Sequence, residues 1–242
     1  IDRLKEIDKN YPAENLDVLQ NLVGSHDTER LSSMINNPDR AFDRDCDERN
    51  PNYNPGKPSK EVYEKQKLIL AFQMLYKGAP MIYQGDEIGM WGADDPHCRK
   101  PMVWSDFKYD DEIINAASGF QKGFGKYKVE PDTSLLAYYK HLFEIRNSNP
   151  ALQKGNVNFL YSNNDKLSFA FERVHNEEKL IAIFNLGKED DNFTLPLDFN
   201  KVSYTELISG NNGIAGSSDQ DAVLNVNINS NSVQVYKLYP LK

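Results

Sequence analysis

Two polar side chains that could serve a catalytic site follow one short apolar run. The run 18–23 ends at Gly24, and His26 and Asp27 come shortly after it. Such a run predicts a buried strand that passes into a loop. In parallel α/β folds the carboxyl ends of the strands meet at the active-site face, so both side chains could reach a ligand there. The alternative is structural, because an Asp after a strand often caps the next helix. That helix is expected over 29–35, with Asp27 or Thr28 as its N-cap.

A second apolar run, 79–83, is followed by the adjacent carboxylates Asp86 and Glu87. Adjacent residues on an extended chain face opposite ways, so these two are not expected to act as one acid–base pair. We therefore interpret a carboxylate here as a buried structural partner in an ion pair.

The loop 89–104 combines aromatic faces with hydrogen-bonding side chains. It contains Trp91, Trp104, Asp95, His97 and Arg99. This combination suits sugars, whose C–H faces stack on aromatic rings and whose hydroxyls need polar partners. The alternative is that the indoles anchor the loop by burial. Neighbouring His97 and Cys98 lack further Cys or His at ligand spacing, so we assign no metal and no cofactor to this chain.

The elements that must position these side chains change character along the chain. A helix is predicted over 61–77, between the two apolar runs, and this order favours a parallel βαβ crossover. Another helix is predicted over 134–147. Beyond Pro150, short alternating strands with Asn, Gly and Ser turns are typical of an antiparallel sandwich. We place a domain boundary near residue 151. The proline-rich segment 36–60 reads equally well as a solvated excursion or as a substrate-facing lip.

Composition excludes several classes of protein. Among 242 residues, 36 Asp and Glu outnumber 28 Lys and Arg, which argues against a nucleic-acid partner. No apolar run approaches ~18 residues, so we predict no membrane span and no membrane partner. Two cysteines cannot build a disulfide scaffold. The chain starts at Ile1, and we expect it to begin inside a larger protein, so its compartment stays open between bacterial cytoplasm, periplasm and secretion.

Three ordered motifs, at 24–30, 78–89 and 95–104, resemble the C-terminal part of an α-amylase family enzyme, glycoside hydrolase family 13. The resemblance is strongest to the neopullulanase and cyclomaltodextrinase branch. It implies an α/β plus all-β chain: the C-terminal part of a (β/α)8 barrel, with strands 7 and 8 and their helices, followed by an antiparallel β-sandwich domain. On this basis 1–151 is the barrel portion and 152–242 the sandwich.

The resemblance also implies roles for single residues. Asp27 matches the family's third catalytic carboxylate, which holds hydroxyls of the −1 glucose and stabilises the transition state. His26 would hydrogen-bond the same sugar, and Arg99, Trp91 and Asp95 are expected to bind substrate. A charged acceptor makes stronger hydrogen bonds than a neutral one, and bonds that strengthen in the oxocarbenium-like state contribute several kcal/mol.

Two catalytic groups of the family have no match in this chain. The nucleophile is an Asp in Gly-x-Arg-x-Asp on the fourth barrel strand, and the acid/base is a Glu ending the fifth. The run 44–47, Arg-Asp-Cys-Asp, lies in the proline-rich loop and is rejected. The family's usual calcium site is likewise implied to lie outside this chain. We expect a fragment of a retaining α-glucan hydrolase that is inactive alone.

Several alternatives and details stay open. A transferase or isomerase of the same family, a carbohydrate-binding module without catalysis, or a scaffold is each compatible with part of the sequence; a binding module does not explain His26 and Asp27. The expected partner is an α-glucan or maltooligosaccharide. The sequence does not decide between α-1,4 and α-1,6 linkages, or between linear and cyclic substrates. Unpaired strand edges of a partial barrel predict self-association.

Overall fold

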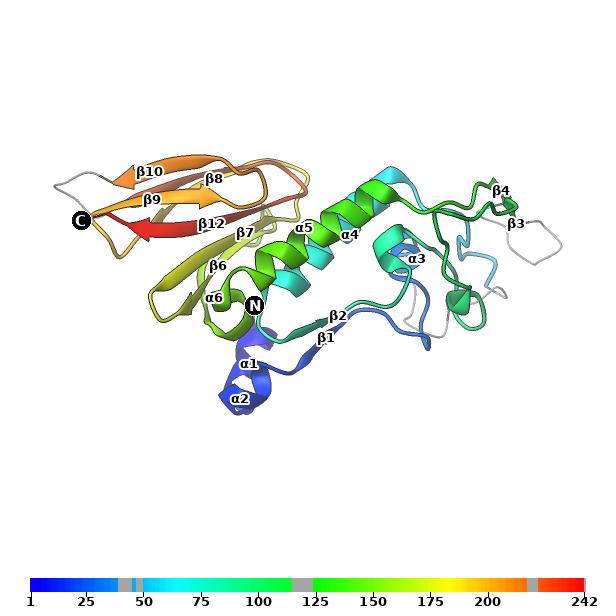
Figure 1. Ribbon diagram of the computed structural model, residues 1–242, viewed down its shortest axis with the longest axis horizontal. Helices are drawn as coiled ribbons and strands as arrows, with labels where there is room; N and C mark the ends of the chain where they lie inside the picture. The colour runs from blue at the N-terminus through cyan, green and yellow to red at the C-terminus, as the bar shows by residue number, and fades with distance from the viewer. Residues whose placement is uncertain (39–44, 47–49, 115–123, 217–221, 242) are drawn as a thin grey trace. The chain divides into compact units, whose positions relative to one another are not determined.

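The computed structural model describes residues 1–38, 45–46, 50–114, 124–216 and 222–241 (Figure 1). Part of the proline-rich segment 36–60, including two residues of the rejected run 44–47, lies outside these ranges. The described chain packs into two compact units. One unit comprises residues 1–20, 70–79 and 141–242, and the other comprises residues 21–69 and 80–140. No described helix is both long and apolar enough to cross a membrane.

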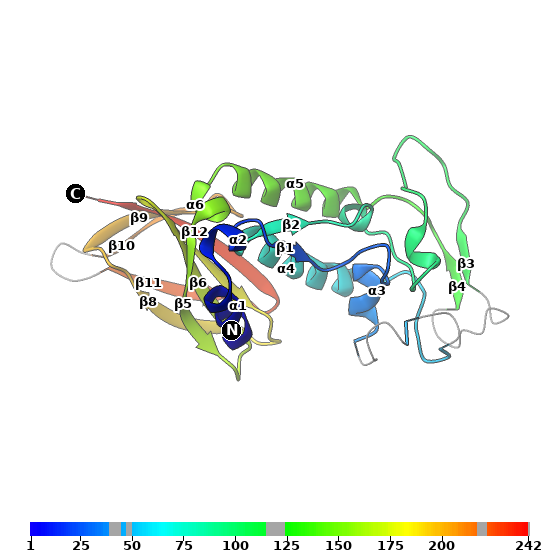
Figure 2. The same ribbon diagram turned by 90° about the horizontal axis from the view of Figure 1, so that it is seen from below.

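The strand–helix–strand order predicted for the first half is present. Strand β1 (Gln20–Leu22) pairs with β2 (Ala79–Met81), and α3 (Leu31–Asn36) and α4 (Lys60–Leu75) lie in the connection between them. Helix α5 (Thr133–Asn147) runs beside α4 in both views (Figures 1 and 2). These elements are the C-terminal part of a (β/α)8 barrel, as the sequence predicted.

Several smaller elements complete this half of the chain. The helices are α1 (Asp2–Asn10), α2 (Ala13–Leu16), α6 (Pro150–Lys154) and the 3-10 turns η1 (Asp86–Ile88) and η2 (His97–Arg99). The hairpin of β3 (Glu112–Ile114) and β4 (Gly125–Tyr127), labelled in Figure 2, has no counterpart in the sequence-based prediction. Each of its strands has three residues, too few for an alternating pattern to be recognised.

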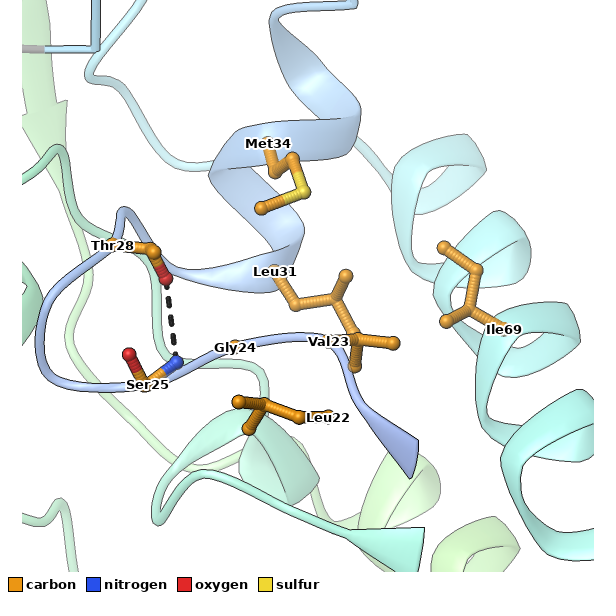
Figure 3. Close-up of a pocket in the computed structure, with 8 residues that line it drawn as sticks. All are labelled: Leu22, Val23, Gly24, Ser25, Thr28, Leu31, Met34 and Ile69. Carbon is orange, nitrogen blue, oxygen red and sulfur yellow. Dashed lines mark hydrogen bonds between the residues drawn. The ribbon is translucent and has the colours of Figure 1, made fainter. Parts of the chain in front are cut away.

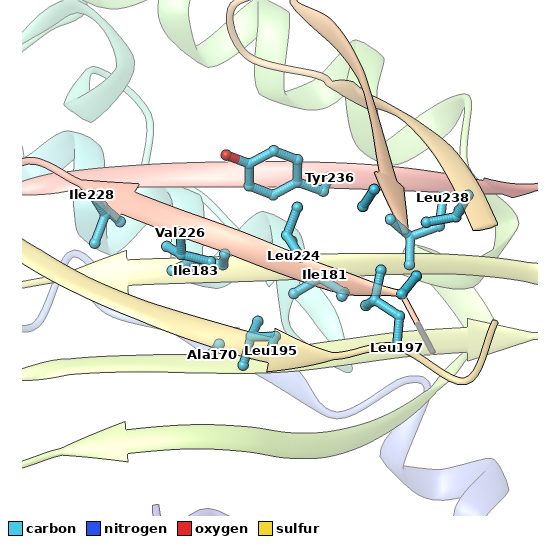
Figure 4. Packing of buried hydrophobic residues seen from close by; sticks show 13 residues of the cluster. Ala170, Ile181, Ile183, Leu195, Leu197, Leu224, Val226, Ile228, Tyr236 and Leu238 are labelled. Atoms are coloured by element: carbon cyan, nitrogen blue, oxygen red, sulfur yellow. The ribbon is translucent and has the colours of Figure 1, made fainter. Parts of the chain in front are cut away.

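The antiparallel sandwich predicted after Pro150 is confirmed. Its strands are β5 (Asn156–Asn163), β6 (Ser168–His175), β7 (Glu178–Asn185), β8 (Asp191–Pro196), β9 (Lys201–Glu206), β10 (Asn212–Gly216), β11 (Val223–Ile228) and β12 (Ser232–Pro240). Six of them form a sheet in the order β10-β9-β12-β7-β6-β5, and β11 pairs with β8. Leu224, Val226 and Ile228 alternate with exposed neighbours and face the core between the sheets (Figure 4). The domain boundary near residue 151 stays a prediction.

Two buried arginines bind the carboxyl end of α4. Arg146 Nη1 donates to the carbonyls of Met74, at 2.6 Å, and Tyr76, at 3.2 Å. Arg173 of β6 donates to the carbonyls of Leu75, at 2.6 Å, and Gly155, at 3.0 Å. The last carbonyls of a helix have no partner inside the helix, so these guanidinium groups supply the missing donors. Burial, with Arg146 nearby, lowers the pKa of Arg173 to about 9.

Within the described ranges, strand β1 has one partner strand, and two apolar residues in or near it are exposed. Among the described strands β1 has only β2 as a partner, and the side chains of Val18 and Leu22 are 70% and 51% exposed. Self-association through the edge of β1 stays a prediction.

Candidate functional site

Four of the five predicted site residues come together on one exposed surface. Asp27 Oδ1 lies 3.3 Å from His26 Nε2 and 3.4 Å from Arg99 Nη2. Arg99 Nε also contacts Asp95 Oδ1, at 2.8 Å. The Asp27 side chain remains 68% exposed, so its carboxylate can accept further hydrogen bonds from a ligand. We call His26, Asp27, Asp95 and Arg99 the Asp27 cluster.

A tight turn after β1 presents the first two members. Ser25 N–H donates to Thr28 Oγ1 at 3.3 Å, and Asp27 N–H donates to Ser25 Oγ at 3.1 Å. The helix that follows starts later than predicted, with Arg30 as its N-cap and no side-chain capping bond. The expectation that Asp27 or Thr28 caps it is therefore wrong. Because Thr28 closes the turn instead, the Asp27 carboxylate is left to face Arg99 and solvent.

The fifth predicted residue, Trp91, lies elsewhere. Its side chain is buried, with the ammonium groups of Lys57 and Lys100 5.2 and 5.3 Å from the ring and Tyr127 packed edge-on. This placement agrees with the alternative that the indole anchors its loop. The role of Trp91 in substrate binding stays a prediction. Trp104, by contrast, is 55% exposed.

The buried ion pair expected beside the second strand end is confirmed for Asp86. The Asp86 carboxylate lies 3.4 Å from Arg30 Nη1, and both side chains are almost fully buried. Arg30 also donates to the Gln84 carbonyl, and its guanidinium lies 4.3 Å from the centre of the Tyr83 ring. Glu87 does not join the pair, because its carboxylate accepts the Gly85 N–H at 2.8 Å.

Burial raises the pKa of Asp86 to about 7, although the Arg30 guanidinium opposes the shift. An unfolded Asp titrates near pH ~4, so between pH ~4 and ~7 the native state binds this proton more tightly than the unfolded state does. The contribution of Asp86 to stability therefore falls as pH rises through that window, by at most about 1.4 kcal/mol per pH unit, and is constant above it.

We expect Asp86→Asn to remove this slope, since the amide does not titrate. Chemical denaturation of both proteins at pH 5, 6, 7 and 8 measures it: the variant should gain stability relative to the native chain up to pH ~7. Parallel stability curves for the two proteins would contradict the assignment.

An apolar cavity of about 330 Å³ lies behind the turn that carries Asp27. Leu22, Val23, Gly24, Ser25, Thr28, Leu31, Met34 and Ile69 line it (Figure 3). Aliphatic side chains dominate this lining, and few polar groups are available to pair with sugar hydroxyls. This cavity is therefore poorly suited to a polar ligand such as a sugar.

The arrangement suits recognition of neighbouring hydroxyls. Asp27 offers a charged acceptor, while His26 and Arg99, both near its Oδ1, carry N–H groups that can donate to a ligand. Within the described ranges, no group of three or more His, Cys, Asp and Glu side chains could hold a metal ion. Sequence reasoning gave no role to Tyr83, whose hydroxyl donates to the Cys98 carbonyl at 3.3 Å, or to Gly92, which packs against the His97 carbonyl. The only signal for Gly92 was a glycine in the loop 89–104.

Comparisons with known proteins agree with this architecture. The family model for the α-amylase catalytic domain matches residues 2–155, and that for the α-amylase C-terminal all-beta domain matches residues 161–239. A cyclomaltodextrinase of Geobacillus thermopakistaniensis (strain MAS1) is 28% identical over 209 residues, covering 86% of this chain and 28% of that protein. Neopullulanase 2 of Thermoactinomyces vulgaris is 29% identical, covering 72% of this chain and 22% of that protein.

Solved structures share the fold. The α-amylase of Geobacillus thermoleovorans, complexed with acarbose, aligns with a TM-score of 0.68 and 20% identity, covering 99% of this chain and 43% of that one. An Anoxybacillus α-amylase aligns with a TM-score of 0.69, covering 99% and 41%. The chain thus spans less than a third of the two curated relatives and less than half of these structures.

Proposed function

Because the chain belongs to the α-amylase family, glycoside hydrolase family 13, we propose that it is the C-terminal part of a retaining α-glucan hydrolase. Asp27 would hold hydroxyls of the glucose at the bond to be cleaved. The observation that carries the proposal is the Asp27 cluster itself: an exposed carboxylate beside His26 and Arg99, in the turn after strand β1.

The proposed mechanism gives each member of the cluster a distinct role. Charge develops on the glucose ring as the glycosidic bond breaks, and hydrogen bonds from ring hydroxyls to Asp27 strengthen in that state. His26 donates to the same sugar. Arg99 orients the Asp27 carboxylate through their 3.4 Å contact, and Asp95 holds Arg99 through their 2.8 Å contact.

Cleavage itself would need two groups from outside this chain. A retaining glycosidase uses a nucleophilic carboxylate and an acid/base carboxyl about 5 Å apart. The second carboxylate of the Asp27 cluster, Asp95, is paired with Arg99. We therefore assign it neither the nucleophile role nor the acid/base role. We propose that upstream strands supply both groups, that no cofactor binds here, and that any calcium site of the whole enzyme lies elsewhere. The short span of this chain relative to its relatives supports this reading.

The substrate we propose is a starch-like α-glucan or maltooligosaccharide. The relatives named cyclomaltodextrinase and neopullulanase support this class, as does the structural relative complexed with acarbose.

We expect the isolated chain to release no reducing sugar from maltoheptaose, cyclodextrin or pullulan above the rate without protein. A longer polypeptide that joins this chain to its upstream barrel strands should hydrolyse at least one of them. In that polypeptide Asp27→Asn should lower kcat by about 10³-fold, the equivalent of several kcal/mol of transition-state stabilisation.

Asp198→Asn is the matched control, because Asp198 is an 87% exposed sandwich carboxylate that pairs with Lys179. It should leave kcat unchanged. If the isolated chain hydrolyses a substrate and Asp27→Asn abolishes that activity, the nucleophile and the acid/base do not have to come from outside this chain. An active longer polypeptide that tolerates Asp27→Asn would contradict the role of Asp27.

A further inference from the structure

Cys98 is linked to both residues whose side chains lie near Asp27 Oδ1, His26 and Arg99. The fully buried Cys98 thiol donates to the His26 carbonyl at 3.3 Å. The next residue, Arg99, carries the guanidinium that contacts Asp27 at 3.4 Å. Cys98 is therefore connected to the main chain of both His26 and Arg99, from which these two side chains extend.

A tyrosine hydroxyl also contacts the backbone of Cys98. Tyr83 Oη donates to the Cys98 carbonyl at 3.3 Å, and no other side chain contributes a hydrogen bond to that carbonyl among the described contacts. The Tyr83 ring is itself fixed, because the buried Arg30 guanidinium lies 4.3 Å from its centre. Arg30 is held in turn by the Gln84 carbonyl and by Asp86. The hydroxyl thus has a defined place relative to the Asp27 cluster.

The main chain of Gly92 closes this arrangement. The Gly92 carbonyl accepts the Arg30 N–H at 3.0 Å. A Cβ on Gly92 would lie only 2.3 Å from the His97 carbonyl oxygen, so the turn that contains Cys98 packs directly on this backbone. Arg30, Tyr83 and Cys98 therefore form a chain of contacts that leads to His26, the neighbour of Asp27.

We propose that Tyr83 is a positioning residue of the site: through the Cys98 backbone, its hydroxyl fixes both His26 and Arg99 against Asp27. The proposal rests on the function proposed above, since that function gives the Asp27 cluster its substrate. Tyr83 itself touches none of the cluster side chains in the contacts described. Its effect is geometric, and displacement of reacting or binding groups by about 1 Å can cost about 10²-fold in rate.

Tyr83→Phe removes only the hydroxyl and keeps the ring on which Arg30 lies. Tyr236→Phe is the matched control, because its hydroxyl also makes one hydrogen bond, to Gln234 at 3.1 Å, but in the sandwich. The chain has four histidines, so imidazole NMR signals of the isolated chain can be assigned one by one. We expect Tyr83→Phe to shift the His26 signal while the His141 and His175 signals stay in place. Tyr236→Phe should leave the His26 signal unmoved.

The second measurement uses the longer polypeptide with its upstream barrel strands. There Tyr83→Phe should lower kcat by about 10- to 100-fold with KM changed less than about twofold, because a transition-state contact is misplaced while most of the substrate contacts remain. If the substitution only reduced the fraction of molecules that fold, the active fraction would fall, and the His26 signal of the folded molecules would stay unshifted.

The two measurements separate the outcomes. An unmoved His26 signal in Tyr83→Phe overturns the proposal, whatever the activity. A shifted signal with unchanged kcat also overturns it, because the displacement would then have no effect on the reaction. If the longer polypeptide hydrolyses no α-glucan, the proposed function fails, and the NMR result alone decides whether Tyr83 positions His26.

Discussion

We expect Gly92→Ala to lower the free energy of unfolding of the site-bearing unit by about 3 kcal/mol, at the upper end of the usual cost of overpacking. The added Cβ would lie 2.3 Å from the His97 carbonyl oxygen and 2.9 Å from its carbon. Both are backbone atoms, so no rotation of a side chain relieves the contact. The turn that carries Arg99 must move away, and Arg99 should lose its contact with Asp27.

Tryptophan fluorescence measures this change, because Trp91 and Trp104 are the only tryptophans and both belong to the unit of residues 21–69 and 80–140. Denaturant unfolding followed by fluorescence should show an earlier midpoint for Gly92→Ala. Gly24→Ala is the control: its Cβ would meet side-chain atoms alone, Asp86 Oδ2 at 3.3 Å and Tyr83 Cβ at 4.0 Å. A Gly92→Ala midpoint equal to that of Gly24→Ala would contradict the packing described here.

The second large effect is expected at the end of α4. Arg173→Met should lower the free energy of unfolding by about 2–3 kcal/mol, because the Leu75 and Gly155 carbonyls lose buried donors at about 1–3 kcal/mol each. Removal of a buried cation offsets part of that loss, since burial already lowers the pKa of Arg173 to about 9. The free energy of unfolding of Arg173→Lys should lie between those of the native chain and Arg173→Met, because an ammonium lacks the planar fork that reaches both carbonyls.

Far-ultraviolet circular dichroism during denaturant unfolding tests this expectation, since it follows the helices and strands around Arg173. Arg3→Met is the surface control; Arg3 is 91% exposed, its only described ion pair is with Glu6, and the change should stay within about 0.5 kcal/mol. If Arg173→Met unfolds at the same denaturant concentration as Arg3→Met, the arginine does not stabilise the end of α4.

The sequence indicated those elements whose pattern is local. The helix predicted over 61–77 is α4, Lys60–Leu75, because its apolar positions repeat at helical spacing. The strand β11, Val223–Ile228, shows the burial alternation that its residue types predict. Local capping was harder to predict: Thr28 closes a turn with Ser25 and Arg30 begins the helix, so Asp27 stays available.

The site could be predicted only in part. His26 and Asp27 are neighbours in the chain, and their position after an apolar run already indicated a strand-end site. Trp91 was expected at the substrate, yet its side chain is buried and two lysine ammonium groups lie close to its ring. An aromatic residue in a loop can either stack on a ligand or anchor the loop. Nothing in the local pattern distinguishes these two outcomes.

The sequence by itself determined the types of the longer elements, the family resemblance and the strand end that carries the acid, because these depend on short-range periodicity and on motifs. Only the tertiary structure decided that Arg99 meets Asp27 across 72 residues and that Arg30 pairs with Asp86 across 56. Such contacts arise when the strand-end loops pack against one another, and the burial that accompanies this packing also sets the pKa of Asp86.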